Sequence, residues 1–289
     1  MNASARSKNI SRLCLPLAVL LLLAAPRVSH AQSAQDIVRK VVGNELWYSD
    51  HDHTRWIYED DYQSPTKNQI KLIVQTPQGN LSEIIRSYGQ MPPPPMHQAD
   101  LTRMRRTVQD PSFRAQQRQN ERHDDQQATN LLKMLPDAFI WRIDSREHGK
   151  IRLSYYPNPN FSPPSMSSRV LAAMSGTMVV NESQMRLEDL FGRLDKPVSF
   201  GWGLLGHLNA GGTFQVIRTE IAPHEWQITE THVHISGHAL FFKSIGDQED
   251  DVTRNYHHVP DDVDLQKGQQ MLLSGEVAKM LGVSDPYAH

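Results

Sequence analysis

The chain has 289 residues, with 30 basic and 32 acidic side chains, 14 His and one Cys. This length suits one large domain or two small ones and can bury a core without disulfide bonds. A formal net charge of −2 argues against a protein that binds nucleic acid through its overall charge. Only 38% of the residues are hydrophobic, but they occur in clusters, which argues against general disorder.

The first segment has the organisation of a secretory signal peptide. A basic start precedes an apolar run from Leu13 to Ala25, which is shorter than the roughly 20 residues that a membrane-spanning helix needs. Small residues at Ser29 and Ala31 then form a cleavage signal. We therefore expect residues 1–31 to be removed by cleavage before Gln32, although an uncleaved anchor is the alternative. This interpretation predicts a periplasmic or secreted bacterial protein that has no transmembrane segment after the signal peptide.

The only cysteine, Cys14, lies at the start of that apolar run. A lipoprotein cysteine would follow the run, so we do not expect N-terminal lipidation. After cleavage, the chain could form no disulfide, thiolate metal site or cysteine nucleophile. An exported protein of this size without disulfides is more typical of a bacterial periplasm than of a eukaryotic extracellular space.

The pattern after residue 32 predicts one helix followed by antiparallel strands. Ser33 is a suitable N-cap, and apolar residues between 37 and 46 form one helical stripe. Strands are predicted at 55–62, 70–74 and 81–88. The turn residues Pro77–Asn80 join the last two of these as a hairpin.

A polar insertion at about residues 92–135 interrupts the strands. It begins at a proline run, and we expect helices within 98–135, broken near Pro111. The segment is rich in arginine, a composition found in RNA-binding and anionic-lipid-binding segments. A solvated helical face is the better interpretation, because Phe113 is the one aromatic residue available there for base stacking.

The second half predicts an antiparallel meander with short turns. The predicted strands are 139–144, 151–155, 177–181, 184–194, 198–202, 213–221, 225–236 and 239–245. Parallel units need crossover connections of a dozen residues or more, and these turns are too short. We expect a short helix at 166–174, a loop at 247–262 and a last helix at 263–281.

The expected fold class is therefore α+β, with residues 32–289 as a single domain. Its sheet is expected to be curved and antiparallel, forming a half-barrel whose concave face is covered by helices. If the cover is incomplete, an apolar cavity remains. Trp202, Phe214 and Phe241 are the residues expected on its inner surface, although a register error of one residue would reverse their faces.

Residues Gly201–Gly206 match the pattern G-x-G-x-x-G. A dinucleotide site needs a helix directly afterwards, inside a parallel βαβ unit. Here Gly211 and Gly212 follow closely, and then another strand. We interpret the glycines as a strand and its bend, and we predict no nucleotide and no other cofactor.

Histidines provide the weak alternative of a metal site. His232 and His234 would lie on one face of a strand, with His238 nearby. A metal site also needs converging partners and second-shell support, so we expect ordinary surface histidines and no metal. The chain lacks a nucleophile elbow, an H-E-x-x-H motif and a P-loop, so no catalytic residue is assigned. The acidic runs 59–61 and 249–251 are expected to be solvated.

Several segments together resemble the LolA-like lipoprotein-carrier superfamily of secreted bacterial proteins. They are residues 176–181, 198–203, 212–214, Trp226 and 237–243. The resemblance is one of pattern over about 35–90 and 137–245. It implies a half-open antiparallel barrel with helices over its mouth. The known carriers of this superfamily hold acyl chains inside that barrel.

The resemblance implies a non-enzymatic function in the periplasm. This function is binding or transport of a lipid, a lipoprotein acyl chain or another apolar ligand in a hydrophobic cavity. Peripheral contact with the envelope membrane is a further expectation, and no nucleic-acid partner is expected. Two alternatives stay open: a metal-dependent or other secreted hydrolase that uses the histidine-bearing strand, and an envelope scaffold or stress-sensing protein that binds a polypeptide.

Overall fold

The computed structural model describes residues 32–284 except 201–205 and 240–247, together with 286 and 287. The expected signal peptide, Trp202, Phe241 and most of the glycine-rich motif lie outside the described residues. The described residues from Ser33 onward belong to one compact unit.

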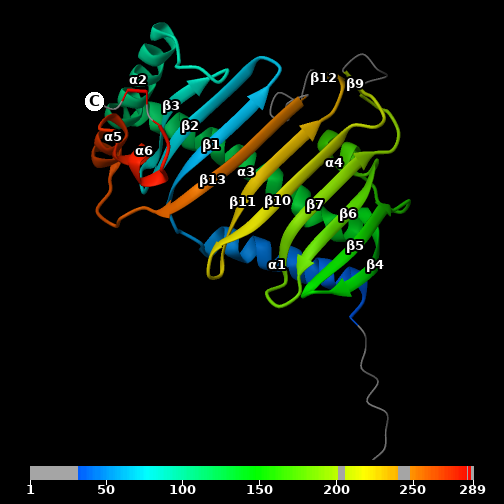
Figure 1. The fold of residues 1–289 in the computed structure, drawn as a ribbon. Helices are drawn as coiled ribbons and strands as arrows, with labels where there is room; N and C mark the ends of the chain where they lie inside the picture. Colours follow the sequence, from blue (N-terminus) through cyan, green and yellow to red (C-terminus); the bar gives the residue numbers. More distant parts are fainter. Residues whose placement is uncertain (1–31, 201–205, 240–247, 285, 288–289) are drawn as a thin grey trace, which may run out of the picture. The chain divides into compact units, whose positions relative to one another are not determined.

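A ten-stranded antiparallel sheet dominates this unit (Figure 1). The strand order is β3-β2-β1-β13-β11-β10-β7-β6-β5-β4, so β3 and β4 are the two edges and the sheet is not closed. The strands are β1 (Trp56–Ser64), β2 (Lys67–Thr76), β3 (Gly79–Ser87), β4 (Phe139–Glu147), β5 (Lys150–Pro157), β6 (Met174–Asn181), β7 (Arg186–Leu194), β10 (Thr213–Ala222), β11 (Glu225–His234) and β13 (Gln248–His258). A separate three-stranded sheet contains β8 (Val198–Phe200), β9 (Gly206–Leu208) and β12 (Gly237–Ala239). The prediction of an α+β fold with a large antiparallel sheet is confirmed.

Helix ends follow local sequence signals. The helices are α1 (Ala34–His51), α2 (Pro94–Gln109), α3 (Pro111–Ala138), α4 (Met166–Leu171), α5 (Leu265–Leu273) and α6 (Glu276–Leu281). Ser33 caps α1, since its hydroxyl oxygen accepts the backbone N–H of Asp36. Asp110 separates α2 from α3 and caps α3, with Pro111 at the first helical position. The predicted break near Pro111 is therefore confirmed.

The prediction of a loop at 247–262 is wrong. Residues Gln248–His258 form β13, which lies between β1 and β11 in the centre of the sheet. This strand carries an acidic run and few apolar residues, because much of its surface is only partly buried. Its hydrophobic alternation is consequently weak, although its backbone pairs with both neighbours.

The two faces of the sheet carry different helices. At the β3 end of the sheet, Ile57, Val74 and Leu81 pack in one cluster with α5 and α6. The neighbouring Tyr58 points to the opposite face, as alternation along a strand requires, and lines a cleft with residues of α1. We call these the α5 face and the α1 face.

The C-terminal helices therefore do not share a face with α1, although both were expected to cover one concave face. The expected last helix is also split into α5 and α6. Gly275 divides them with a left-handed backbone (φ +73°), a conformation that glycine adopts without steric cost.

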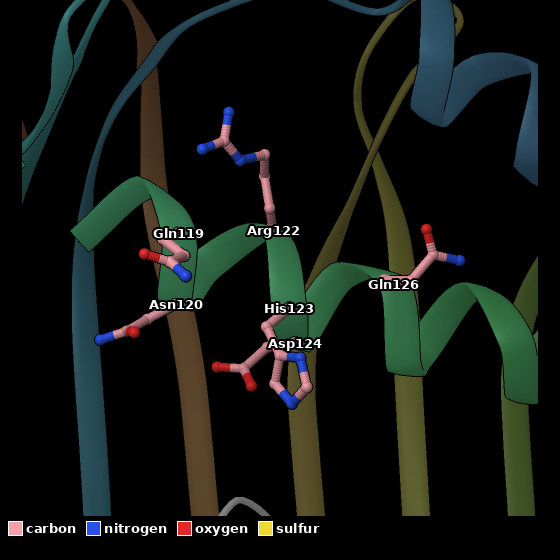
Figure 2. A pocket seen from close by; sticks show the side chains of 6 residues that line it. All are labelled: Gln119, Asn120, Arg122, His123, Asp124 and Gln126. Atoms are coloured by element: carbon pink, nitrogen blue, oxygen red, sulfur yellow. The ribbon is translucent and has the colours of Figure 1, made fainter. Parts of the chain in front are cut away.

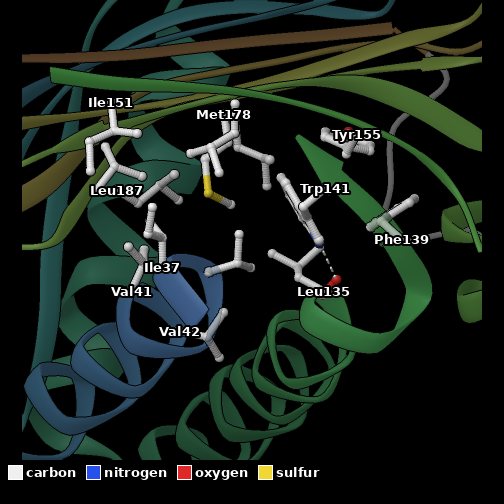
Figure 3. Close-up of a cluster of buried hydrophobic side chains, with 14 of the residues drawn as sticks. Ile37, Val41, Val42, Leu135, Phe139, Trp141, Ile151, Tyr155, Met178 and Leu187 are labelled. Atoms are coloured by element: carbon white, nitrogen blue, oxygen red, sulfur yellow. Dashed lines mark hydrogen bonds between the residues drawn. The ribbon is translucent and has the colours of Figure 1, made fainter. Parts of the chain in front are cut away.

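The largest hydrophobic cluster lies on the α1 face at the β4 end (Figure 3). Ile37 and Val41 of α1 face Met178 and Leu187 of the sheet across this cluster. Trp141 belongs to it, and its indole N–H donates to the carbonyl oxygen of Leu135 at 3.0 Å. The cluster thus fixes α1 and the C-terminal end of α3 on the same face.

Candidate functional site

The middle of α3 does not pack against the sheet that it crosses. Every residue from Arg118 to Gln126 is exposed, and nine residues make about two and a half helical turns. A helix packed on a sheet would bury one stripe of side chains. In Figure 2 the labelled side chains of this segment project in several directions from a helix that crosses the strands. We call residues Arg118–Gln126 the bridge, because this part of α3 stands away from the sheet.

Contacts at both ends and along the helix hold the bridge in place. Arg114 donates to two carbonyl oxygens at the end of α2 at 2.9 Å, and Leu135 is buried in the core at the other end. Along the helix, side chains four residues apart are hydrogen bonded, including His123 with Gln127 at 2.7 Å. Such pairs stabilise a helix that is polar on all sides.

A cleft of about 430 Å³ lies between the α1 face of the sheet, the end of α1 and the bridge. It is lined by Glu45, Tyr48, Ser49, Asp52, Thr54, Tyr58, Gln75, Asp125, Arg186, Arg218, Trp226, Gln227, Ile228, Thr253 and Tyr256. Asp125 belongs to the bridge, so the cleft lies where α3 leaves the sheet uncovered. A second hollow, drawn in Figure 2, is lined by six residues of α3 alone and therefore does not enclose a ligand between two elements.

Aromatic and apolar side chains form the sheet wall of the cleft. Tyr58 and Tyr256 are stacked with their ring centroids 5.1 Å apart. Ile228 lies beside them and remains 49% exposed, although it is a large apolar side chain on a central strand. Burial raises the pKa of Tyr58, with the neighbouring Tyr256 and Asp60 adding to the effect. Burial also raises the pKa of Tyr256, so both tyrosines are neutral at physiological pH and contribute apolar ring surface.

An ion-pair network forms the floor of the cleft. The buried carboxylate of Glu45 on α1 accepts from Arg186 Nε at 2.9 Å, from Arg186 Nη2 at 3.1 Å and from Arg218 Nη1. It also accepts the backbone N–H of Leu187 at 2.9 Å. The Arg186 guanidinium lies over the ring of Tyr48 at 4.0 Å. One carboxylate thus connects α1 to β7 and β10.

This network carries more positive than negative charge. Two guanidinium groups share one carboxylate, and Arg186 Nη1 and Arg218 Nε have no hydrogen-bond acceptor among the described residues. Burial lowers the pKa of Arg218, while the charge of Glu45 opposes that effect. Asp52 and Asp125 also line the cleft, but they are exposed or half-buried.

Two carboxyl groups lie close together on the same face, beyond the tyrosine stack. Asp251 lies beside Asp60, whose Oδ2 binds Lys71 Nζ at 2.8 Å. Burial, followed by the charge of Asp60 and the hydrogen bond with it, raises the pKa of Asp251 to about 7. The expectation that both acidic runs are solvated is therefore wrong for Asp60 and Asp251, because alternation turns them toward the partly buried α1 face. It is also wrong for Glu59, which is buried and paired with Arg254.

Asp251→Asn is expected to stabilise the protein at alkaline pH. The folded-state pKa is raised, so the wild-type loses stability as the pH rises from about 4 to about 7. An amide removes this loss. The free energy of unfolding of the variant should therefore exceed that of the wild-type by about 1–2 kcal/mol at pH 8, a figure reduced for solvent screening. Urea unfolding at pH 5 and pH 8 measures the effect, with the exposed Asp261→Asn as control. An equal effect of Asp251→Asn at both pH values would contradict the raised pKa of Asp251.

The predicted histidines are only partly brought together. His232 and His234 lie on the α5 face and both contact Asp250, through His232 Nδ1 at 2.6 Å and His234 Nε2 at 3.0 Å. His238 lies in the other sheet, opposite His207. Among the described residues, no group of three or more His, Cys, Asp or Glu side chains has a geometry that could hold a metal ion.

The structure places Phe214 on the α1 face, where its ring packs against Gly192 and two hydrophobic clusters. Phe214 does not line the cleft. Gly206 begins β9, and the rest of the glycine-rich motif lies outside the described residues.

The sequence contains one signal for the cleft floor that the prediction did not use. Glu45 continues the apolar stripe of α1, eight residues after Ile37 and four after Val41. A charged residue at a core position of a helix indicates a buried partner of opposite charge. Its partners Arg186 and Arg218 are more than a hundred residues away in sequence, so their identity requires the fold.

Comparison with known proteins found no matching family model, no matching curated protein and no matching solved structure. In the described part of the chain, no helix is both long and apolar enough to cross a membrane.

Proposed function

We propose that this protein binds an amphiphilic ligand, such as a lipid or a lipoprotein acyl chain, in the cleft beneath the bridge, without catalysing a reaction. The observation that carries the proposal is the bridge itself. A helix exposed on all sides lies opposite a wall that contains Tyr58, Trp226, Ile228 and Tyr256. Apolar surface beneath a helix would normally be closed by packing, because its burial contributes roughly 25 cal/mol per Å².

The lining favours an amphiphile over a purely apolar molecule. Aromatic rings and Ile228 offer contact for an acyl chain, whereas the arginine and aspartate side chains require a polar group. The sequence led us to expect a hydrophobic cavity. The site that we propose is instead a cleft with an apolar wall and a charged floor. Binding in the periplasm remains part of the proposal.

A fluorescent fatty-acid probe is expected to bind saturably and to be displaced by lipid extracted from a bacterial envelope. Ile228→Asp should weaken probe binding at least about tenfold, because it places a charge in the apolar wall (about 1.4 kcal/mol). Fluorescence titration measures the affinity of each variant.

Ile140→Asp is the matched control for this experiment. Ile140 is also a partly exposed isoleucine of the sheet, but it lies on the α5 face, because its neighbours Phe139 and Trp141 are buried in the cluster on the α1 face. This variant should keep wild-type affinity. Equal affinities for all three proteins, or no saturable binding to the wild-type, would reject the proposed function.

A further inference from the structure

We infer that the cleft floor at Arg218 and Arg186 holds a singly charged oxyanion of the ligand, a carboxylate or a phosphodiester. This inference rests on the proposed function and specifies the polar group of the amphiphile. The juxtaposition that carries it is one carboxylate between two guanidinium groups at the base of an open cleft.

The charge balance is the first step. Buried charges are normally paired, because an unpaired buried ion loses its hydration without compensation. The side chains of Glu45 and Arg186 are both only 2% exposed and form a one-to-one pair. Arg218 then adds a second positive charge to the same carboxylate. The floor has one guanidinium more than it has buried carboxylates.

Hydrogen-bonding capacity is the second step. A guanidinium group has five N–H donors and is suited to planar oxyanions. Arg218 uses Nη1 for Glu45 and Nη2 for the carbonyl oxygen of Trp226 at 3.1 Å, and its side chain is 19% exposed. Nε of Arg218 and Nη1 of Arg186 are buried and have no acceptor among the described residues, and both side chains line the cleft.

The remaining acidic groups limit the charge of the ligand. Asp52 and Asp125 line the same cleft, and their carboxylates would repel a doubly charged group. Asp52 already accepts the backbone N–H of Thr54 at 2.9 Å. A monoanion satisfies the excess guanidinium without adding a second charge next to these two carboxylates.

The apolar wall next to Arg218 indicates where the apolar chain of the same ligand would lie. The carbonyl oxygen of Trp226 binds Arg218, and Ile228 follows two residues later on the same strand and the same face. A head group at Arg218 would therefore have its chain beside Ile228 and the ring of Tyr256. This order along β11 matches an amphiphile with one anionic end.

The test compares four soluble amphiphiles below their micelle concentrations by isothermal titration calorimetry. They are laurate, lauroyl lysophosphatidylglycerol, dodecyl phosphate and the neutral dodecyl maltoside. The wild-type protein should bind at least one of the two monoanions about tenfold or more tightly than dodecyl maltoside, and more tightly than the doubly charged dodecyl phosphate at pH 8. Whether laurate or the lysophospholipid binds more tightly identifies the carboxylate or the phosphodiester as the natural group.

Arg218→Gln provides the residue-specific test. It leaves Glu45 paired with Arg186, so the fold should be retained, and it should remove the tighter binding of monoanions relative to dodecyl maltoside. The control is Arg142→Gln, an exposed arginine paired with Asp144 outside the cleft.

The outcomes separate this inference from the proposed function. If the wild-type protein binds neutral and anionic amphiphiles equally, the oxyanion site is rejected and the amphiphile cleft stands. If the wild-type protein binds none of the four, both are rejected. The wild-type head-group preference decides between these outcomes even if Arg218→Gln does not fold.

Discussion

Glu45→Ala is expected to cost about 3–5 kcal/mol of unfolding free energy, the largest loss among single side-chain removals outside the hydrophobic clusters. The substitution removes the carboxylate that pairs with both Arg186 and Arg218, and it leaves two guanidinium groups without a buried counter-ion. It also removes the acceptor for the backbone N–H of Leu187. Chemical denaturation followed by circular dichroism measures the loss.

Glu182→Ala is the matched control for that measurement. Glu182 pairs with Arg146 at 3.0 Å, but both side chains are about 40% exposed. Exposed ion pairs contribute at most about 1 kcal/mol. A loss for Glu45→Ala as small as that of the control would show that the network does not connect α1 to the sheet.

Gly176→Ala is expected to destabilise the protein by about 2–3 kcal/mol, because no room exists for a methyl group at this position in the sheet. A Cβ atom on Gly176 would lie 1.9 Å from the carbonyl oxygen of Phe191 and 2.8 Å from Tyr155 Oη. The backbone oxygen cannot move without breaking the pairing of β6 with β7, so the strands must separate locally. Thermal and urea unfolding should both report the change.

Gly43→Ala tests the same substitution where space is available. Gly43 lies on the exposed side of α1, and outside the backbone of this helix no atom lies within 4 Å of the position that a methyl group would take. Alanine has the higher helix propensity, so this variant should gain about 0.5–1 kcal/mol. If both alanine variants were neutral, the close approach of Tyr155 and Phe191 to Gly176 would be wrong.

The parts of the fold that the sequence could predict are those with strong local signals. The cap at Ser33, the apolar stripe of α1, the break at Pro111 and the hairpin turn at 77–80 all appear as expected. Each depends on residues close in sequence. The antiparallel pairing of β4 with β5 and of β6 with β7 also follows, because turns of a few residues join the two strands of each pair.

The central strand β13 was not predictable from alternation. Its residues on the α1 face include Asp251 and Thr253 rather than aliphatic side chains, because that face borders the cleft and carries the neighbouring Asp60 and Asp251. Polar residues that line a functional surface weaken the pattern by which a strand is identified. The polar residues on this face therefore make β13 difficult to predict from the sequence, and they also line the candidate site.

The candidate site depends on distances that the sequence does not contain. Glu45, Arg186 and Arg218 come from α1, β7 and β10, and they meet only because β7 and β10 are adjacent in the sheet beneath α1. Similarly, the polar composition of residues 98–135 predicts a solvated helix. It does not predict that this helix crosses the sheet without packing on it.

The most direct test of ligand binding in the cleft is to locate a bound acyl chain on the protein. A fatty acid with a photoreactive diazirine in its chain is incubated with the purified protein and irradiated, and the modified peptides are identified by mass spectrometry. The predicted adducts lie on both sides of the cleft, on bridge residues 118–126 and on the wall at Trp226, Ile228 and Tyr256, and excess unlabelled fatty acid should suppress them. Adducts confined to the α5 face around His232 and Val252, or adducts that excess fatty acid does not suppress, would contradict the assignment of the cleft beneath the bridge as the ligand site.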